Sequence, residues 1–278
     1  TNGNISLTTT SGDITGLAIV NAGSGNVTLN SAGAIVDDGS AGTVITGGVL
    51  TADAAGAITI DSTVASANIS TSAAGNVDLD ETDGITLTDL DTNDGSITVE
   101  AGGLITATDV VAAGGSGDSV TLTTTTGGAV ATLVTGADAV SITANAGDIT
   151  IGAVTATAGI LGVTATAGSI NDAADDNTAD FTAGGLITLT AQDEIGVLGS
   201  GTDTDLEFAT GSSVNISTTG TGAIDLDGLG TLTLTDLDTA NGAITATSAG
   251  ALTVTDVASG TNGNISLTTT SGDITGLA

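Results

Sequence analysis

The sequence contains no lysine, arginine or histidine, and it also lacks cysteine, methionine, proline, tryptophan and tyrosine. Its 32 acidic residues therefore give a formal charge of −32, with no basic side chain to pair with them. Nucleic acids and anionic membrane surfaces are bound through Lys and Arg, so the composition excludes both as partners. The absence of cysteine excludes disulfides, thiolate chemistry and cysteine-based metal sites.

Aromatic residues and long hydrophobic runs are scarce as well. Phe181 and Phe208 are the only aromatic residues. No apolar run reaches the roughly 18 residues of a membrane-spanning helix, so we expect no membrane insertion. The positive mean hydropathy and the many β-branched residues are typical of a folded β-protein rather than a disordered chain. Because the sequence has neither an initiating Met nor a signal-peptide pattern, we expect it to be a segment of a longer or processed polypeptide.

Repetition is the most informative feature that is present. The segment TNGNISLTTTSGDITGLA occupies residues 1–18 and returns unchanged at residues 261–278, an offset of 260. We therefore expect residues 1–260 to be one repeat unit and residues 261–278 to begin the next, identical repeat. A less exact copy links LTDLDTNDGSITV, residues 87–99, with LTDLDTANGAITA, residues 234–246.

A finer period, of about 20 residues, runs through most of the chain. It is clearest in the segments GAITID, GNVDLD and GSITVE, which begin at Gly56, Gly75 and Gly95. Each contains alternating apolar and polar residues, the pattern of a β-strand with one buried face, and Gly, Asn, Asp and Ser separate the strands. One such unit cannot bury its apolar face alone, whereas stacked units can. The sequence therefore predicts an all-β, single-stranded β-solenoid without helices, with about 20 residues per coil and about 13 coils per repeat. Tandem immunoglobulin-like β-sandwiches are the alternative.

The acidic stretch NDAADDNTAD, residues 171–180, breaks this period. We expect it to form a loop that protrudes from the solenoid, because its charges favour solvent and its residues do not alternate. A loop of this kind is also a candidate contact point for a ligand or partner.

Two stretches resemble a known family. GNISLTTTSGDITG and GGLITLTAQDEIG are similar to the repeats of filamentous-haemagglutinin-type exoproteins and of giant bacterial β-strand-repeat surface proteins. The resemblance implies a right-handed, roughly three-sided parallel β-helix. It also implies secretion to the bacterial cell surface and a role in adhesion or in surface fibres.

The residues available for catalysis are few. Without His, Lys, Cys, Arg or Tyr, only carboxylates and hydroxyls remain. Carboxylate pairs can hydrolyse glycosides, and Asp78 with Asp80, or Asp225 with Asp227, lie two residues apart on one strand face. Solvated outward side chains are the favoured explanation of these pairs, and we expect the protein not to be an enzyme and to require no cofactor.

Carboxylates at equivalent positions of successive coils form the candidate cation sites. The alignments place Asp61, Asp80 and Glu100 at one position, Asp89 with Asp109 at another, and Asp236 with Asp256 at a third. Stacked coils would hold such carboxylates roughly 5 Å apart, where they repel one another. They either splay into solvent or bind a cation such as Ca²⁺, and a weak Ca²⁺ site at these residues is the metal hypothesis.

One segment imitates an EF-hand. DLDTNDGSITVE, residues 89–100, has acidic residues at several ligand positions, but Asp94 stands where an EF-hand loop has Gly. We expect it to form a turn between coils.

These observations together favour a structural role. We expect a repeat of a long extracellular filament, fibre or sheath, in which identical repeats continue end to end and divalent cations bridge neighbouring solenoids. The stalk of a large adhesin is the alternative. An ice-binding surface is a weaker one, suggested by Thr-x-Thr pairs such as Thr233 and Thr235.

Overall fold

The structure is a computed structural model of the 278-residue chain. It describes residues 2–40, 42, 44–174, 176–196, 205–260 and 263–276. Residue 1, residue 175 of the predicted acidic loop, and residues 261–262 and 277–278 of the predicted second repeat lie outside the described residues. Within the described ranges the secondary structure is β-strand without helix, as the sequence predicts.

The strands are short and follow one another at close intervals. Their bounds are β1 (Ile5–Thr8), β2 (Ile14–Leu17), β3 (Val20–Asn21), β4 (Val27–Ser31), β5 (Ile35–Asp37), β6 (Ile45–Ala54), β7 (Ile58–Ala74), β8 (Val77–Glu81), β9 (Ile85–Asp94), β10 (Ile97–Ala101), β11 (Ile105–Ala107), β12 (Val110–Ala112), β13 (Val120–Thr124), β14 (Ala129–Gly136), β15 (Val140–Ala144), β16 (Ile149–Ala156), β17 (Leu161–Ala165), β18 (Ile170–Asp172), β19 (Phe181–Ala183), β20 (Leu186–Ala191), β21 (Leu206–Phe208), β22 (Ser212–Thr218), β23 (Ile224–Gly228), β24 (Leu232–Thr239), β25 (Ile244–Ser248), β26 (Leu252–Val254), β27 (Val257–Ser259), β28 (Ile265–Thr269) and β29 (Ile274–Gly276).

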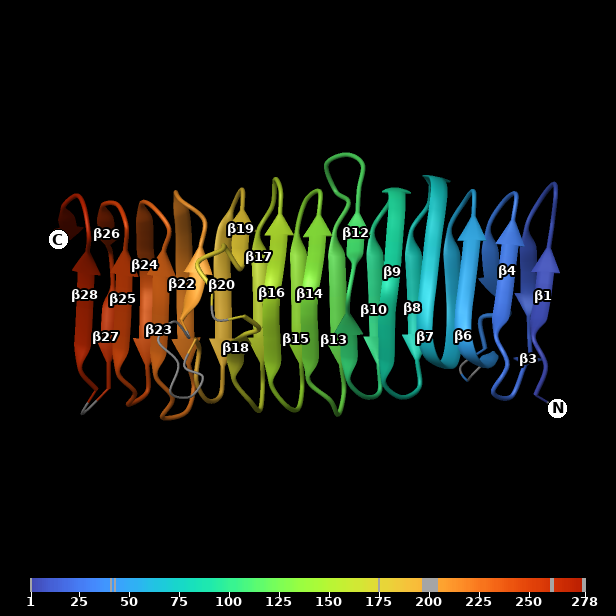
Figure 1. The fold of residues 1–278 in the computed structure, drawn as a ribbon, viewed down its shortest axis with the longest axis horizontal. Helices are drawn as coiled ribbons and strands as arrows, with labels where there is room; N and C mark the ends of the chain where they lie inside the picture. The colour runs from blue at the N-terminus through green and yellow to red at the C-terminus, as the bar shows by residue number, and fades with distance from the viewer. Residues whose placement is uncertain are drawn as a thin grey trace.

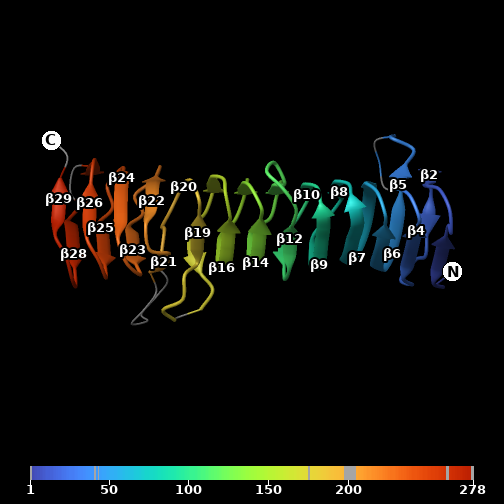
Figure 2. The same cartoon turned by 90° about the horizontal axis from the view of Figure 1, so that it is seen from above.

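These strands stack into a β-solenoid of about 12 turns with roughly 21 residues per turn. The chain rises along the near side of Figure 1 and descends along the far side while it advances toward the C-terminus, so the coil is right-handed. Figure 2 shows the same stack from above, with one terminus at each end of the rod. Neighbouring coils pair in parallel register, for example Ile97 of β10 with Val120 of β13. The predicted β-solenoid is confirmed, and no antiparallel sandwich occurs in the described part of the chain.

A central coil shows how one turn is built. It consists of β10, β11 and β12, which are separated by short turns and pair with β13 and β14 of the next coil. In β9, β14 and β16 the second and third sides of the turn form one continuous strand. Each coil therefore has three sides, two of which merge in several turns.

The core lies inside the coil and is made of columns of aliphatic side chains. Alternate residues of each strand point inward, as in β10, where Ile97 and Val99 are fully buried and Glu100 is exposed. A fully buried Ile, Val or Leu side chain stabilises the folded state by about 1.5–3 kcal/mol. Each coil buries its apolar face on the coils before and after it, which explains why the short period is visible in the sequence.

The coils lengthen in three regions. The pairs that span them are Ile35 with Ile58, Ile97 with Val120, Leu161 with Ile187, and Ile187 with Val214. The corresponding steps along the sequence are 58 − 35 = 23, 120 − 97 = 23, 187 − 161 = 26 and 214 − 187 = 27. These longer coils reduce the turns of residues 1–260 below the number predicted from a constant period. The described residues contain no helix long and apolar enough to span a membrane.

The predicted acidic loop occupies one of the lengthened coils. Its exposed part lies between β18 and β19 and projects from the side of the rod in Figure 2. Its two ends differ from the prediction, because Asn171, Asp172 and Asp180 are buried rather than solvated.

Candidate metal centre

The first predicted carboxylate column lies on the outer face of three successive coils. Asp61 of β7 pairs with Asp80 of β8, and Asp80 pairs with Glu100 of β10. This register confirms the alignment made from the sequence, whereas Ca²⁺ binding at these residues stays a prediction. The column ends at Thr123, the partner of Glu100 on the next coil.

Burial and the charges of nearby carboxylates raise the proton affinity of Asp61 and Asp80. Burial, followed by the charge of Asp37, raises the pKa of Asp61. Burial, followed by the charge of Asp78, raises the pKa of Asp80. Asp61 and Asp80 also line a shallow depression with Asp37, whose carboxylate accepts a hydrogen bond from the Asp61 backbone N–H at 3.1 Å. The carboxylates are thus close enough to disfavour one another's charge, but they remain open to water.

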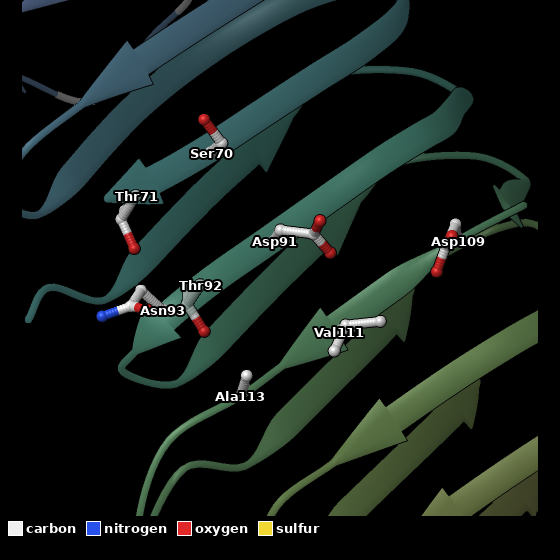
Figure 3. A pocket seen from close by; sticks show the side chains of 8 residues that line it. All are labelled: Ser70, Thr71, Asp91, Thr92, Asn93, Asp109, Val111 and Ala113. Carbon is white, nitrogen blue, oxygen red and sulfur yellow. The ribbon is translucent and has the colours of Figure 1, made fainter. Parts of the chain in front are cut away.

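The second column is formed by Asp89 and Asp109. The backbone N–H of Leu90 donates to the Asp109 carbonyl at 3.0 Å, which places the two aspartates at equivalent points of adjacent coils. Asp109 and its neighbour Asp91 line an open depression across three coils (Figure 3). Burial, followed by the charges of Asp89 and Asp109, raises the pKa of Asp91.

The third column repeats this arrangement near the C-terminal end. Leu237 pairs with Val257, so Asp236 and Asp256 precede paired residues on adjacent coils. Burial, followed by the charges of these two aspartates, raises the pKa of Asp238. In each predicted column the register therefore brings the carboxylates together, but their side chains are partly or fully exposed.

The EF-hand-like segment, residues 89–100, does not form a single loop. Asp89 lies in β9 and Glu100 lies in β10, which are strands on different sides of the coil. The residues between them turn the chain from one side to the next, as expected from the sequence.

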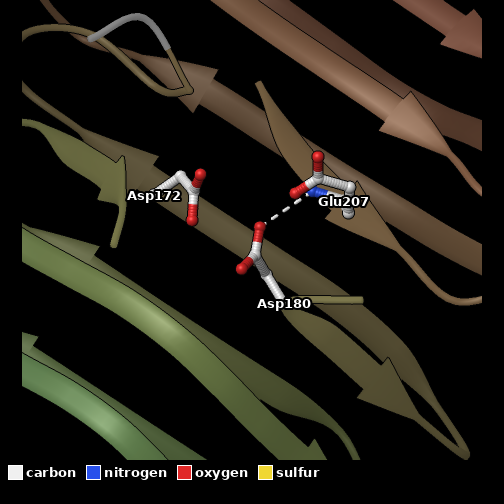
Figure 4. A group of neighbouring side chains, drawn as sticks. All are labelled: Asp172, Asp180 and Glu207. Carbon is white, nitrogen blue, oxygen red and sulfur yellow. Dashed lines mark hydrogen bonds between the residues drawn. The ribbon is translucent and has the colours of Figure 1, made fainter. Parts of the chain in front are cut away.

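A more enclosed group of carboxylates was not identified from the sequence. Asp172 ends β18, Asp180 directly precedes β19, and Glu207 is the middle residue of β21. One carboxylate oxygen from each residue lies within 4.8 Å of the other two. Figure 4 shows the three side chains converging on a common space. This cluster is the strongest candidate site in the described residues.

The three side chains of the cluster are almost completely buried. The exposed fraction is 9% for Asp172, 4% for Asp180 and 1% for Glu207. The Glu207 backbone N–H donates to Asp180 Oδ2 at 2.9 Å, and the Ala174 N–H donates to Asp172 Oδ1 at 2.9 Å. These backbone contacts fix two of the carboxylates. Glu207 Oε1 is buried and has no hydrogen-bond partner among the described residues.

Burial is the largest influence on the proton affinity of all three residues. It raises the pKa of Asp180 to about 7, against the opposing effect of its hydrogen bond from Glu207. It also raises the pKa of Glu207, with a further contribution from neighbouring Asp180, and the pKa of Asp172. An empty cluster therefore retains protons near neutral pH.

A sequence signal for this cluster exists. Asp180 and Glu207 directly precede the two phenylalanines, Phe181 and Phe208, so the same acidic–aromatic pair occurs twice. The two rings stack with centroids 5.3 Å apart, which brings the acidic residues before them onto adjacent coils. No protein-family model, curated protein or solved structure matches this chain.

Proposed function

We propose that the chain is a structural repeat of a long extracellular bacterial filament, fibre or sheath that continues end to end as one β-solenoid. The observation that carries this proposal is the equivalent placement of the two identical segments. In the first segment Thr9 donates to the Gly12 carbonyl at 2.9 Å, and in the second Thr269 donates to the Gly272 carbonyl at 3.1 Å. Both glycines have positive φ, 85° and 100°. The same turn therefore occurs at both ends of the rod.

The strand register supports continuation. Stepwise pairing on one side of the coil leads through Ile14, Ile35, Ile58, Val77, Ile97, Val120, Val140, Leu161, Ile187, Val214, Leu234, Val254 and Gly276. These 12 pairing steps lead from Ile14 to Gly276, an advance of 276 − 14 = 262 residues. The copy of Ile14 in the second identical segment is Ile274, which lies 274 − 14 = 260 residues after it. The difference of two is even, so inward positions remain inward in a following repeat.

Burial at the last coil favours the same proposal. Ile244 is fully buried beneath its pairing partner Ile265, while Ile265 itself is 45% exposed. A further coil paired onto β28 would cover Ile265 as β28 covers Ile244. It would also satisfy the open backbone groups of the edge strand.

The outer surface supports a structural rather than an enzymatic role. It carries carboxylates and hydroxyls without any basic residue, so parallel solenoids repel one another. Lateral association into a sheath would use divalent cations between the carboxylate columns. The cell-surface location in this proposal rests on the resemblance of the repeats to filamentous-haemagglutinin-type proteins.

A two-repeat protein tests the proposal. Residues 1–260 followed directly by residues 1–278 should form one straight rod of about 115 Å, twice the length of about 58 Å for 12 coils. Small-angle scattering measures the length, and electron cryo-microscopy should show a layer line near ~4.8 Å that continues through the junction. Two jointed rods, or compact beads, would contradict a continuous solenoid.

A single substitution sharpens this test. Ile265→Asp should cost little in the 278-residue chain, where Ile265 is partly exposed. In the two-repeat protein the same residue lies inside the rod, and its replacement should destabilise the junction by about 3 kcal/mol or more. Equal melting-temperature losses in both proteins would show that the second repeat does not pack onto the first.

A further inference from the structure

The lengthened coils bring three carboxylates together in a nearly closed space. The end of β18 supplies Asp172, the insert before β19 supplies Asp180, and the following coil supplies Glu207 through β21. The Asp180 N–H donates to the Glu207 carbonyl at 3.0 Å, and the Glu207 N–H donates back to Asp180 Oδ2. Backbone pairing between coils therefore brings Asp180 and Glu207 together.

Charge balance requires a partner for this cluster. Three ionised carboxylates buried together cost far more free energy than a pair of solvated ones, and the chain has no Lys, Arg or His to neutralise them. Either protons or a cation must supply positive charge. Glu207 Oε1 lies in this buried space without a hydrogen-bond partner among the described residues, so an acceptor is left available there.

We propose that Asp172, Asp180 and Glu207 bind one Ca²⁺ ion, which ties the acidic insert to the adjacent coil. Ca²⁺ prefers carboxylate oxygens at about 2.3–2.6 Å and accepts irregular arrangements of them. Two oxygens on opposite sides of such an ion are about 4.8 Å apart, and the three carboxylate oxygens lie within 4.8 Å of one another. Mg²⁺ requires a tighter and more regular octahedron and keeps more of its water. Water and peptide carbonyls would complete the Ca²⁺ coordination.

This site differs from the exposed columns in what it offers the ion. Asp61, Asp80 and Glu100 lie one per coil on an open face, where water competes for both the ion and the carboxylates. The cluster contributes three anionic ligands from a nearly closed space, with two carboxylates already held by backbone N–H groups. We therefore expect one tight site at the cluster and weaker, salt-sensitive binding at the columns.

Calorimetric titration with CaCl₂ tests the proposal on the 278-residue chain after removal of divalent ions with EDTA. The expected result near neutral pH in moderate salt is one saturable Ca²⁺ site per chain and a higher melting temperature with Ca²⁺. Asp180→Asn and Glu207→Gln should each weaken this site by about tenfold or more. The matched control Asp80→Asn removes a column carboxylate and should leave the tight site unchanged.

Tb³⁺ luminescence gives a second readout that is specific for this location. Phe181 and Phe208 are the only aromatic side chains, and they directly follow Asp180 and Glu207. Light absorbed by phenylalanine should therefore sensitise Tb³⁺ bound at the cluster, and Ca²⁺ should displace the signal. Circular dichroism establishes that each variant is folded before its binding is compared.

The outcomes distinguish a bound metal ion from bound protons as the charge that neutralises the cluster. Absence of a saturable Ca²⁺ site in the unaltered chain, or equal affinity in the folded Glu207→Gln variant, would overturn the proposal and leave shared protons as the neutralising charge. A stronger response to Mg²⁺ than to Ca²⁺ would overturn the choice of ion. None of these results depends on whether repeats continue end to end, because the cluster lies within a single repeat.

Discussion

At the residue scale, Glu81 shows how a carboxylate is accommodated inside the regular coil. It is the last inward residue of β8 and is buried, whereas Asp78 and Asp80 on the same strand point outward. The Ser62 hydroxyl donates to Glu81 Oε2 at 2.6 Å, and the Val64 N–H donates to the same oxygen at 3.1 Å. Burial is the largest influence on Glu81 and raises its pKa. The side chain therefore acts as an acceptor for neighbouring donors rather than as a favourable charge.

This environment predicts a difference between two substitutions. Glu81→Gln keeps an acceptor for Ser62 and Val64 and removes a buried charge, so the free energy of unfolding at neutral pH should change by less than about 1 kcal/mol or increase. Glu81→Ala leaves both donors without a partner and should cost about 2 kcal/mol. Urea unfolding followed by circular dichroism measures both. The exposed control Asp78→Ala should change stability by less than about 0.5 kcal/mol, and equal losses for Gln and Ala at Glu81 would show that the charge itself is required.

At the scale of the element, a recurrent turn fixes the path of the chain at two corners of the coil. A Ser or Thr hydroxyl at the end of a strand donates to a backbone carbonyl three or four residues later, usually that of a glycine. The hydroxyls that do this belong to Thr9, Ser31, Thr71, Thr92, Thr124, Thr218, Thr239 and Thr269. The sequence shows this turn as a Thr followed by Gly after two or three residues, a pattern that alternation alone does not reveal.

The turn after β13 gives the clearest test. Thr124 is fully buried and donates to the Gly127 carbonyl at 2.6 Å. Thr124→Val should lower the free energy of unfolding by about 1–3 kcal/mol, because the half-buried Gly127 carbonyl loses its donor. Gly127→Ala should cost about 1–3 kcal/mol as well, since an added Cβ would collide with the backbone of Gly103 and Leu104 on the preceding coil. The control Thr121→Val lies outward on the same strand and should change unfolding in urea by less than about 0.5 kcal/mol.

The stacked phenylalanines mark the lengthened coils. Both rings are fully buried and face each other across β19 and β21. Phe208→Ala should cost about 3–5 kcal/mol because a cavity replaces the ring. Phe208→Leu keeps most of the volume and should lose chiefly the ring–ring contact, about 0.5–1.5 kcal/mol. Hydrogen exchange should locate the loss in the coils around residue 208; protection lost uniformly along the rod would contradict this local effect.

The comparison of sequence and structure is also clearest at the level of elements. The period and the alternation predict the column of Ile58, Val77 and Ile97, because each coil presents an inward aliphatic residue at the same point. The pairing of Asp61 with Asp80 follows from the same period, since no insertion separates their coils. The buried cluster could not be placed in this way. Its geometry depends on the length and path of the inserts, which lie outside the period.

At the scale of the whole molecule, the absence of basic residues changes the usual response to acid. Acid commonly unfolds proteins because carboxylates lose their ion pairs with Lys, Arg and His. This chain has no such pairs to lose. Resolved pKa shifts in the described residues are upward at Asp61, Asp80, Glu81, Asp91, Asp172, Asp180, Glu207, Asp225 and Asp238, and downward at Asp38 and Asp176, which are exposed.

These shifts predict that acidification stabilises the solenoid. A carboxylate whose pKa is raised by folding binds protons more tightly in the folded state, so its stabilising contribution is complete below the unfolded value near 4 and is lost as pH rises through the folded value, about 7 for Asp180. In EDTA, the melting temperature should therefore be higher at about pH 5 than at about pH 8, by roughly 5 °C. Salt at about 1 M, which shortens the screening length to about 3 Å, should reduce this difference by weakening repulsion at the higher pH. A melting temperature that is lower at pH 5 than at pH 8 would show that ionised carboxylates stabilise the fold through contacts other than ion pairs. That result would contradict repulsion as the dominant effect of the charge.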